Sequence, residues 1–397
     1  MRIAHYVSHF PDPGGTTTAM LGLSAGLVRL GHHVVVYGDR PRKHPAEWEP
    51  VLNRAGAAGI EVPDSRPGNS PYPREKRRQI LAALASDRDR LDALVIHSVF
   101  GMSHPTVERA ARRGGITRLA CPHDPYTPEL FREHRVLKTV YWHLREAPFL
   151  RRMQAIQVLA PSHTQYLRDR RIGVPVFAIP DGLEEEQIEP FDAPIAEGPD
   201  PDAVPPGIDS ELRLFYFGRW DVYNKGLDIL LEAIAAEGSV PSSVTLQIAG
   251  NGSHRDRRRL ERLIASLGLE ARASVVGFLP DVRSAIRSAD FVILPSRFDG
   301  FAQSVTEALA LGTPVIVSSR AGSSEYFGRK DGALVTEPDV GSLVRTLQVA
   351  LGSRRALREA ANAGRARLAR EFNWDEVARR WIEEAQRLGA LPARSGH

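Results

Sequence analysis

The sequence predicts an α/β protein with two doubly wound parallel sheets, and three observations support this. The chain has 397 residues, more than the ~250–300 that one hydrophobic core usually holds. Short, continuously apolar runs such as Leu94–Ile96 and Phe291–Leu294 alternate with helical patterns, as the buried strands of a parallel sheet require. A stretch rich in Pro, Asp and Gly at residues 189–210 separates two such series.

The first series opens with a βαβ unit. We expect a strand over Arg2–Ser8, a Pro/Gly turn, a helix over Thr16–Leu30 that ends at Gly31, and a strand over Val34–Tyr37. Further strands are expected at Ala93–Ile96, Thr117–Cys121, Ala155–Leu159 and Val176–Ile179.

The second series alternates strands with helices. The strands are expected at Leu212–Phe217, Val244–Ala249, Ser274–Val276, Phe291–Leu294, Pro314–Val317 and Ala333–Val335. The helices are expected at Leu227–Ala236, Arg255–Leu267, Arg283–Ser288, Val305–Leu311 and Val340–Leu351, with a last helix at Asp375–Leu388. We therefore expect an N-terminal domain over 1–182, a connector over 183–210 and a C-terminal domain over 211–373, with residues 374–397 packing back on the first domain.

Charge is unevenly distributed along the chain. Residues 1–182 carry 26 Lys and Arg against 17 Asp and Glu, whereas residues 183–397 carry 26 against 31. The basic N-terminal half suggests an anionic partner or surface, and a chance imbalance is an equal alternative. The chain has no RNP pattern, zinc finger or basic heptads, so we expect no nucleic-acid partner.

Other classes are disfavoured by simple counts. Cys121 is the only cysteine, which excludes an internal disulfide and a cysteine-based metal cluster. No apolar run approaches the ~20 residues of a membrane-spanning helix. The first residues break their apolar run at once and do not resemble a signal peptide, so we expect a cytoplasmic protein.

In open α/β sheets, ligands bind outside the carboxyl ends of the strands, so the residues that follow each strand are the candidates. Gly14 and Gly15 follow the first strand and open a helix, where backbone N–H groups attract phosphate. The alternative is an ordinary tight turn with a Thr N-cap. Arg219 and Lys225 follow the strand at 212–217, on one expected loop, where two cations could neutralise a diphosphate. The alternative is solvated surface charge.

Two carboxylates, Asp299 and Glu307, flank the junction between the strand at Phe291–Leu294 and the next helix. A carboxylate near a helix start can accept hydrogen bonds from both hydroxyls of a ribose. The alternative is structural, because Ser304 and Glu307 have the spacing of a capping box.

Taken together, these motifs resemble the family 4 retaining glycosyltransferases of the GT-B fold. The resemblance rests on the order of Pro122-His123-Asp124, Ala178-Ile179-Pro180-Asp181-Gly182, Gly218-Arg219, Lys225-Gly226, Gly250-Asn251-Gly252, Val276-Gly277-Phe278-Leu279, the acidic pair and Gly312-Thr313-Pro314. It covers residues 211–330 strongly and residues 1–182 weakly. It implies two Rossmann-like domains that face a central cleft.

The resemblance also implies a role for each site residue. Arg219 and Lys225 would hold the donor diphosphate, and Glu307 would bind the ribose. The catalytic set would be Arg219, Lys225, His123 and Asp299, and the donor-binding set Gly15, Gly250, Gly277, Leu279, Gly300, Phe301, Ala302 and Glu307. A lone His after a strand is otherwise more often structural, which is the alternative for His123.

The family usually has Glu-Gly-Phe-Gly where this chain has Asp299-Gly300-Phe301-Ala302, which leaves the donor sugar open. The implied activity is transfer of a hexose-type sugar, with retention, from a UDP- or GDP-linked donor to a small-molecule, glycan or lipid-linked acceptor. The acceptor would bind mostly in the N-terminal domain. A nucleotide-sugar epimerase of the same fold and a non-catalytic nucleotide-sugar-binding protein are the alternatives.

No cofactor besides the donor co-substrate is expected, and no metal. The two Asp-x-Asp triplets lie in a charged run, at 87–89, and in the connector, at 200–202. The segment Phe131–Arg152 mixes aromatic and basic residues. It is either a helix that lies weakly on an anionic membrane or an ordinary domain helix.

Overall fold

The computed structural model describes residues 1–8, 10, 14–38, 82, 91–132, 134–184, 187–188, 211–236 and 238–392. The chain divides into two compact units, Met1–Glu184 with Glu371–His397, and Glu185–Arg370. Most of the expected connector and both Asp-x-Asp triplets lie outside the described residues.

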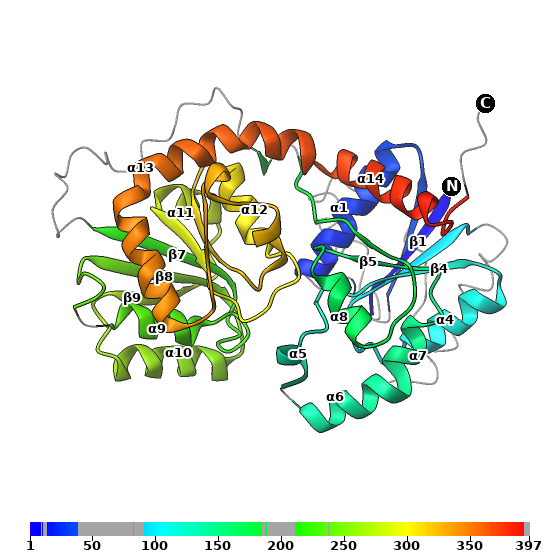
Figure 1. Cartoon of the computed structure of the whole chain (residues 1–397), viewed down its shortest axis with the longest axis horizontal. Coiled ribbons are helices and arrows are strands. Elements are labelled where there is room, and N and C mark those ends of the chain that lie inside the picture. The colour runs from blue at the N-terminus through cyan, green and yellow to red at the C-terminus, as the bar shows by residue number, and fades with distance from the viewer. Residues whose placement is uncertain are drawn as a thin grey trace. The chain divides into compact units, whose positions relative to one another are not determined.

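The first unit contains a six-stranded parallel sheet in the order β2-β1-β3-β4-β5-β6, with helices on both of its faces (Figure 1). The order reverses between β1 and β3, which makes this pair the switch point of the sheet. The strands are β1 (Arg2–Tyr6), β2 (His33–Tyr37), β3 (Ala93–His97), β4 (Thr117–Cys121), β5 (Ala155–Val158) and β6 (Val176–Ala178).

Small residues let two helices of the first unit approach closely. An added Cβ on Gly22 would lie 2.0 Å from the ring of Trp374, and one on Gly26 would lie 2.3 Å from its carbonyl oxygen. These contacts join α1 to α14. The helices are α1 (Gly15–Arg29), α4 (His104–Arg113), α5 (Pro128–Arg132), α6 (Arg135–Tyr141), the π-helix η2 (Trp142–Glu146), α7 (Ala147–Leu150), α8 (His163–Asp169) and α14 (Trp374–Arg387).

The second unit contains another six-stranded parallel sheet, in the order β12-β11-β10-β7-β8-β9. Its switch point lies between β7 and β10. The strands are β7 (Leu212–Arg219), β8 (Val244–Asn251), β9 (Ala273–Gly277), β10 (Phe291–Leu294), β11 (Val315–Ser318) and β12 (Ala333–Thr336). The two sheets confirm the predicted fold class.

The helices of the second unit flank its sheet, and one is much longer than expected. The last, α13, continues past the expected end at Leu351 because Leu357, Ala361 and Leu368 prolong its buried stripe. The helices are α9 (Leu227–Ile234), α10 (His254–Ser266), α11 (Val282–Ser288), α12 (Gln303–Ala310), the 3₁₀ turns η4 (Gly322–Glu325) and η5 (Arg329–Asp331), and α13 (Val340–Glu371). Within the described part of the chain, no helix combines the length and the apolar character needed to span a bilayer.

Candidate functional site

Three glycines form the carboxyl edge of the second sheet. Gly218, Gly250 and Gly277 lie at the ends of β7, β8 and β9, with φ values of 147°, 120° and 82°. An added Cβ on Gly250 would lie 1.9 Å from the carbonyl oxygen of Gly218, its register partner. Only glycine fits such a backbone, so the backbone at this edge is free of side chains and can be approached closely.

An ion pair joins the two strands of the switch point. Lys225 lies in the turn between β7 and α9, and Asp299 lies in the loop between β10 and α12. The Nζ of Lys225 lies 2.5 Å from the Oδ2 of Asp299, and the other carboxylate oxygen accepts the backbone N–H of Ala302 at 3.1 Å. Both side chains are largely buried, so dissolved salt screens the attraction between their charges less than it would on the surface.

Arg219 occupies a different position from the one expected. It ends β7 and pairs in register with Asn251 of β8, because the strand continues past Phe217. Its side chain is exposed. Arg219 and Lys225 therefore do not share one loop, although both lie at the carboxyl end of β7.

The loop before α12 holds an unusual backbone. Ala302 has a φ of 50° and ψ of 71°, a left-handed conformation that costs a residue with a Cβ about 1–2 kcal/mol. Such strain concentrates at functional sites. The ring of Phe301 packs edge-on against Tyr326 in the core, with centroids 5.7 Å apart. Phe301 therefore offers a ligand only its backbone, and Gly300 before it is buried as well.

Glu307 is a desolvated carboxylate. Burial raises its pKa to about 7, and the charge of Arg283 opposes this rise in part. The capping-box alternative is wrong, because α12 begins after Ala302 and has no side-chain cap. Glu307 instead lies in the second turn of the helix. A carboxylate with a raised pKa at a strand-to-helix junction is a candidate for ligand binding.

The end of β9 presents an exposed aromatic residue. Phe278, between Gly277 and Leu279, is 77% exposed, whereas Leu279 is half-buried. A large exposed apolar side chain next to open backbone suits contact with a flat, partly apolar group.

The first unit holds the other two candidates, Gly15 and His123. Gly15 is the first residue of α1, is exposed, and has no atom within 4 Å of an added Cβ among the described residues. The Thr N-cap alternative is wrong, because Gly14 occupies the N-cap position. His123 follows β4 with a φ of 63°, and its Nε2 lies 2.8 Å from the Nδ1 of His97.

His97, Cys121 and His123 form a group whose side-chain N and S atoms lie within 4.8 Å of one another. Two nitrogens bound at about 2.0–2.1 Å to one tetrahedral metal would lie about 3.3 Å apart. The observed 2.8 Å is the separation of a hydrogen bond. Burial, followed by the charge of Asp181, also raises the pKa of the Cys121 thiol well above its ordinary value, which disfavours the thiolate that metals bind. The expected absence of a metal stays a prediction.

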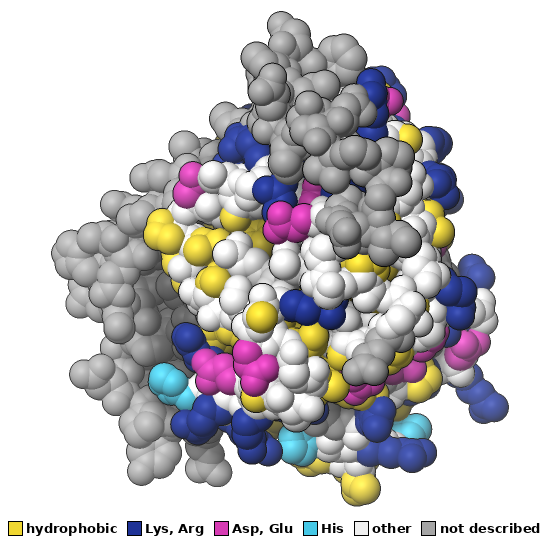
Figure 2. Space-filling model, turned by 90° about the vertical axis from the view of Figure 1, so that its left-hand side faces the viewer, with side chains coloured by type: hydrophobic (Ala, Val, Ile, Leu, Met, Phe, Trp, Pro, Cys, Tyr) yellow, Lys and Arg dark blue, Asp and Glu magenta, His cyan; other side chains and the backbone are white. Residues whose placement is uncertain are grey.

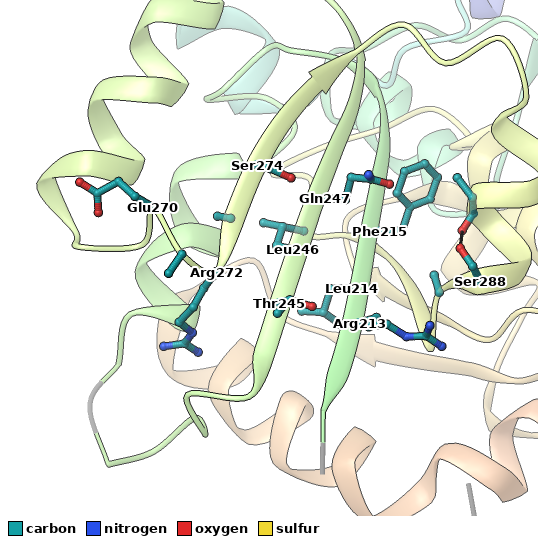
Figure 3. A pocket seen from close by; sticks show the side chains of 14 residues that line it. Arg213, Leu214, Phe215, Thr245, Leu246, Gln247, Glu270, Arg272, Ser274 and Ser288 are labelled. Carbon is teal, nitrogen blue, oxygen red and sulfur yellow. Dashed lines mark hydrogen bonds between the residues drawn. The ribbon is translucent and has the colours of Figure 1, made fainter. Parts of the chain in front are cut away.

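A pocket of about 300 Å³ lies elsewhere in the second unit (Figure 3). It is lined by the starts of β7, β8 and β9 and by α11, including Arg213, Thr245, Arg272 and Ser288. Parallel sheets bind ligands at the opposite, carboxyl ends of their strands. We therefore place the candidate site at the carboxyl edge.

The sequence did not single out several residues that support these sites. Tyr216 donates its hydroxyl to the carbonyl of Arg219 at 2.7 Å, and burial, followed by the charge of Asp299, raises its pKa. His5 and His97 lie beneath His123. A polar residue within an apolar strand is the signal that could have identified all three.

On the face of the second unit shown in Figure 2, cationic and anionic side chains are interspersed, so the local ion pairs matter more than a single-sign field.

Two family models match the chain. A glycosyl transferase 4-like domain matches residues 14–182, and the model of glycosyl transferases group 1 matches residues 211–353. The two matches correspond to the two sheets.

Similar proteins share nearly the whole length. The chain is 27% identical to MMP α-(1→4)-mannosyltransferase of Mycolicibacterium hassiacum, over 92% of each protein. Among solved structures, sucrose-phosphate synthase of Thermosynechococcus elongatus has a TM-score of 0.71 at 20% identity and covers 98% of this chain and 99% of its own. HepE of Anabaena, in complex with UDP and glucose, has a TM-score of 0.72 at 17% identity and covers 98% and 100%.

Proposed function

Because this chain belongs to the group 1 glycosyltransferases of the GT-B fold, we propose that it transfers a hexose-type sugar, with retention, from a UDP- or GDP-linked donor. The observation that carries this proposal is the ion pair of Lys225 and Asp299 at the switch point of the second sheet. It places a cation and a carboxylate where open α/β sheets bind nucleotides. The names of two similar proteins support the substrates: a mannosyltransferase, and a structure with UDP and glucose.

The charges suit a nucleoside diphosphate as leaving group. The diphosphate gains negative charge as the glycosidic bond breaks, so cations placed there stabilise the transition state more than the ground state. Lys225 and Arg219 supply those cations from the carboxyl end of β7. The backbone of Gly250 and Gly277 leaves room for the phosphates and the base.

The carboxylate of Glu307 would accept hydrogen bonds from the ribose hydroxyls, and Asp299 with Gly300, Phe301 and Ala302 would face the sugar. The side chain of Glu307 is desolvated, and ligand hydroxyls would replace the lost water. In the first unit, Gly15 would approach the diphosphate and His123 the sugar, next to an acceptor.

Turnover with each nucleotide sugar tests this function. Release of UDP or GDP that depends on an acceptor supports transfer, and an α-linked product from an α-linked donor, seen in the proton NMR spectrum, supports retention. An isomerised donor formed without an acceptor would identify an epimerase. Binding without turnover of any donor would identify a non-catalytic binding protein.

We also propose that the reaction needs no metal, because Arg219 and Lys225 provide positive charge. Full activity after dialysis against EDTA supports this. Loss of turnover that Mg²⁺ or Mn²⁺ restores would overturn it without affecting the transferase assignment.

The first unit carries a surface that suits a lipid-linked acceptor. None of the residues of α6 is buried, and Val136, Leu137 and, on the following turn, Leu144 are 79%, 69% and 69% exposed. The aromatic residues of the segment face the other way: Phe131 and Trp142 are buried, with Arg170 stacked on them. The lack of buried residues in α6 favours the membrane-surface interpretation of this part of the segment over that of an ordinary domain helix.

Basic residues flank this aliphatic strip, among them Arg135, Lys138 and Arg145. Exposed aliphatic side chains bordered by cations fit the headgroup layer of an anionic membrane. We therefore propose that α6 and η2 rest weakly on such a surface while the acceptor is bound.

Vesicle co-sedimentation tests the surface. Binding to vesicles with 30% phosphatidylglycerol should exceed binding to neutral vesicles and fall in 0.5 M salt. Leu137→Ser with Leu144→Ser should abolish it, whereas Val349→Ser, which changes an exposed apolar residue of α13, should not. Equal binding by both variants would overturn the proposal.

A further inference from the structure

Three histidines form a hydrogen-bonded chain at the switch point of the first sheet. His5 lies in β1, His97 ends β3 and His123 follows β4. The Nδ1 of His5 lies 2.8 Å from the Nε2 of His97, and the Nδ1 of His97 lies 2.8 Å from the Nε2 of His123. Ring centroids are 5.1 Å apart in both pairs.

The chain runs from the interior toward the surface. His5 and His97 are buried, with 0% and 1% exposure, whereas His123 is half-buried. At the inner end, the Nε2 of His5 is buried and has no hydrogen-bond partner among the described residues. His123 is thus the member of the chain that can meet a ligand.

The buried inner end sets the direction of the hydrogen bonds. If His123 donated from Nε2, His97 would donate in turn to His5, and His5 would carry its proton on Nε2, where no described acceptor meets it. A buried N–H without a partner is rare in proteins. The opposite direction leaves only an unshared lone pair there: His5 donates from Nδ1 to His97, and His97 donates from Nδ1 to His123.

The innermost ring is neutral at physiological pH. Burial, followed by repulsion from the charge of a protonated His123, lowers the pKa of His5 to about 3. A neutral imidazole has one donor and one acceptor nitrogen, so fixing one role fixes the other.

We propose that His5 and His97 are positioning residues that hold His123 as the tautomer protonated on Nδ1. Nε2 of His123 then accepts the hydrogen bond from Nδ1 of His97, and Nδ1 of His123 offers substrate a hydrogen-bond donor. It does not act as a base toward the acceptor. The use of His123 toward a sugar rests on the proposed function, but its tautomer does not.

The strained backbone agrees with a fixed ring. Ser98, Phe100 and His123, in the loops after β3 and β4, all have φ values between 55° and 72°. Non-glycine residues keep such conformations only where the surroundings determine them. The contact with His97 is one such constraint for His123.

The tautomer can be measured directly in the intact protein. In long-range ¹H–¹⁵N spectra at pH 7.5, the Nε2 of His123 should have the shift of an unprotonated nitrogen and Nδ1 that of a protonated one. The same pattern is expected for His97. A protonated Nε2 on His123, or a doubly protonated ring, would overturn the proposal. A protein without transferase activity but with this pattern would overturn the proposed function alone.

Two variants separate positioning from simple stability. In His97→Asn the amide reaches about as far as Nδ1 and can still donate to His123, whereas in His97→Gln it reaches toward the position of Nε2. We expect kcat to fall about tenfold or more in H97Q and to stay within about threefold in H97N, with the KM for donor changed less than about twofold in both. The ¹⁵N pattern of His123 should change only in H97Q.

His104→Gln is the matched control, because His104 is also fully buried and lies against the backbone of His97, but its ring is not a member of the hydrogen-bonded chain. It should leave kcat unchanged. Equal losses in all three variants, in step with their melting temperatures, would show a structural role and overturn the proposal. Zn²⁺ that shifts the resonances of His97 and His123 and raises the melting temperature would overturn it in favour of a metal site.

Discussion

Lys225 and Asp299, 74 positions apart in the sequence, pair at 2.5 Å across the switch point of the second sheet. Without its partner, either side chain would place an unpaired charge beside the low-dielectric interior. The Asp299 carboxylate is thus the anionic partner of Lys225 in this structure. Under the proposed function, a donor diphosphate would replace Asp299 as the anionic partner of Lys225.

Lys225→Ala should lower kcat by about 10²–10³-fold, because the cation acts on charge that is greatest in the transition state. It should also destabilise the protein by about 1–3 kcal/mol, because Asp299 loses its partner while largely buried. Initial rates at saturating donor and urea unfolding measure the two effects.

Arg297→Ala is the control for this variant. Arg297 lies in the same loop as Asp299 and pairs at 2.7 Å with Asp228 in the first turn of α9, with similar exposure but outside the candidate site. It should lose stability and keep its kcat. A comparable loss of kcat in both variants would remove Lys225 from the site.

Glu307→Gln should make stability less dependent on pH. The folded pKa of about 7 lies above the ordinary 4.5, so between these values the folded state binds more protons and stability falls as pH rises. The penalty is complete above pH 7 and amounts to about 3 kcal/mol. The variant should therefore melt higher than wild type at pH 8, with little difference at pH 4.

The same variant should bind nucleotide about 1.5–3 kcal/mol more weakly, because it loses a charged acceptor. Calorimetric titration with UDP and GDP measures this. Unchanged affinity for both nucleotides would contradict the role of Glu307 at the ribose, whatever the melting curves show.

Ala302→Gly should stabilise the protein by about 0.5–1 kcal/mol. The left-handed conformation penalises the Cβ of Ala302 by more than glycine costs in unfolded-chain entropy. The urea midpoint should rise. Ala308→Gly, in the right-handed interior of α12, should lower it by about 1 kcal/mol or more. A fall in both variants would show that the backbone at Ala302 is not strained.

Gly15→Ala and Gly22→Ala should differ although they lie on the same helix. An added methyl at Gly15 meets nothing within 4 Å among the described residues, so folding should be unchanged and a loss of donor affinity would report approach to the diphosphate. At Gly22 the methyl meets Trp374, which should cost about 1–3 kcal/mol. Normal donor affinity in the Gly15 variant would exclude that residue from the site.

The two sheets could be predicted because parallel strands are buried on both faces and leave continuous apolar runs, such as Phe291–Leu294. The glycines at the strand ends could be predicted equally well, since glycine is the residue that readily adopts the positive φ values found there. The full length of α13 could not be predicted, because Gly352 resembles the end of a helix. The helix continues past it because tertiary burial of Leu357 stabilises the next turns.

Contacts between distant residues were beyond the sequence. Nothing in the spacing of Lys225 and Asp299 distinguishes a paired cation from a free one. His5 and His97 are 92 positions apart, and only the β1–β3 pairing brings them together. The Ser304–Glu307 spacing suggested a capping box that does not exist, because the N-cap lies at Ala302 and Glu307 lies one turn inside the helix.

The first unit is built from two separate segments of the chain, and these are translated before and after the second unit. Its strands are complete by Ala178, but Trp374, whose ring fills the space left by Gly22, is translated almost two hundred residues later. Until then the face of α1 that packs on Trp374 lacks its partner, although the whole second unit, Glu185–Arg370, is translated before Trp374. The unit that is translated first is thus the one that finishes folding last, and a nascent chain that stops before α14 exposes an apolar helix face to chaperones.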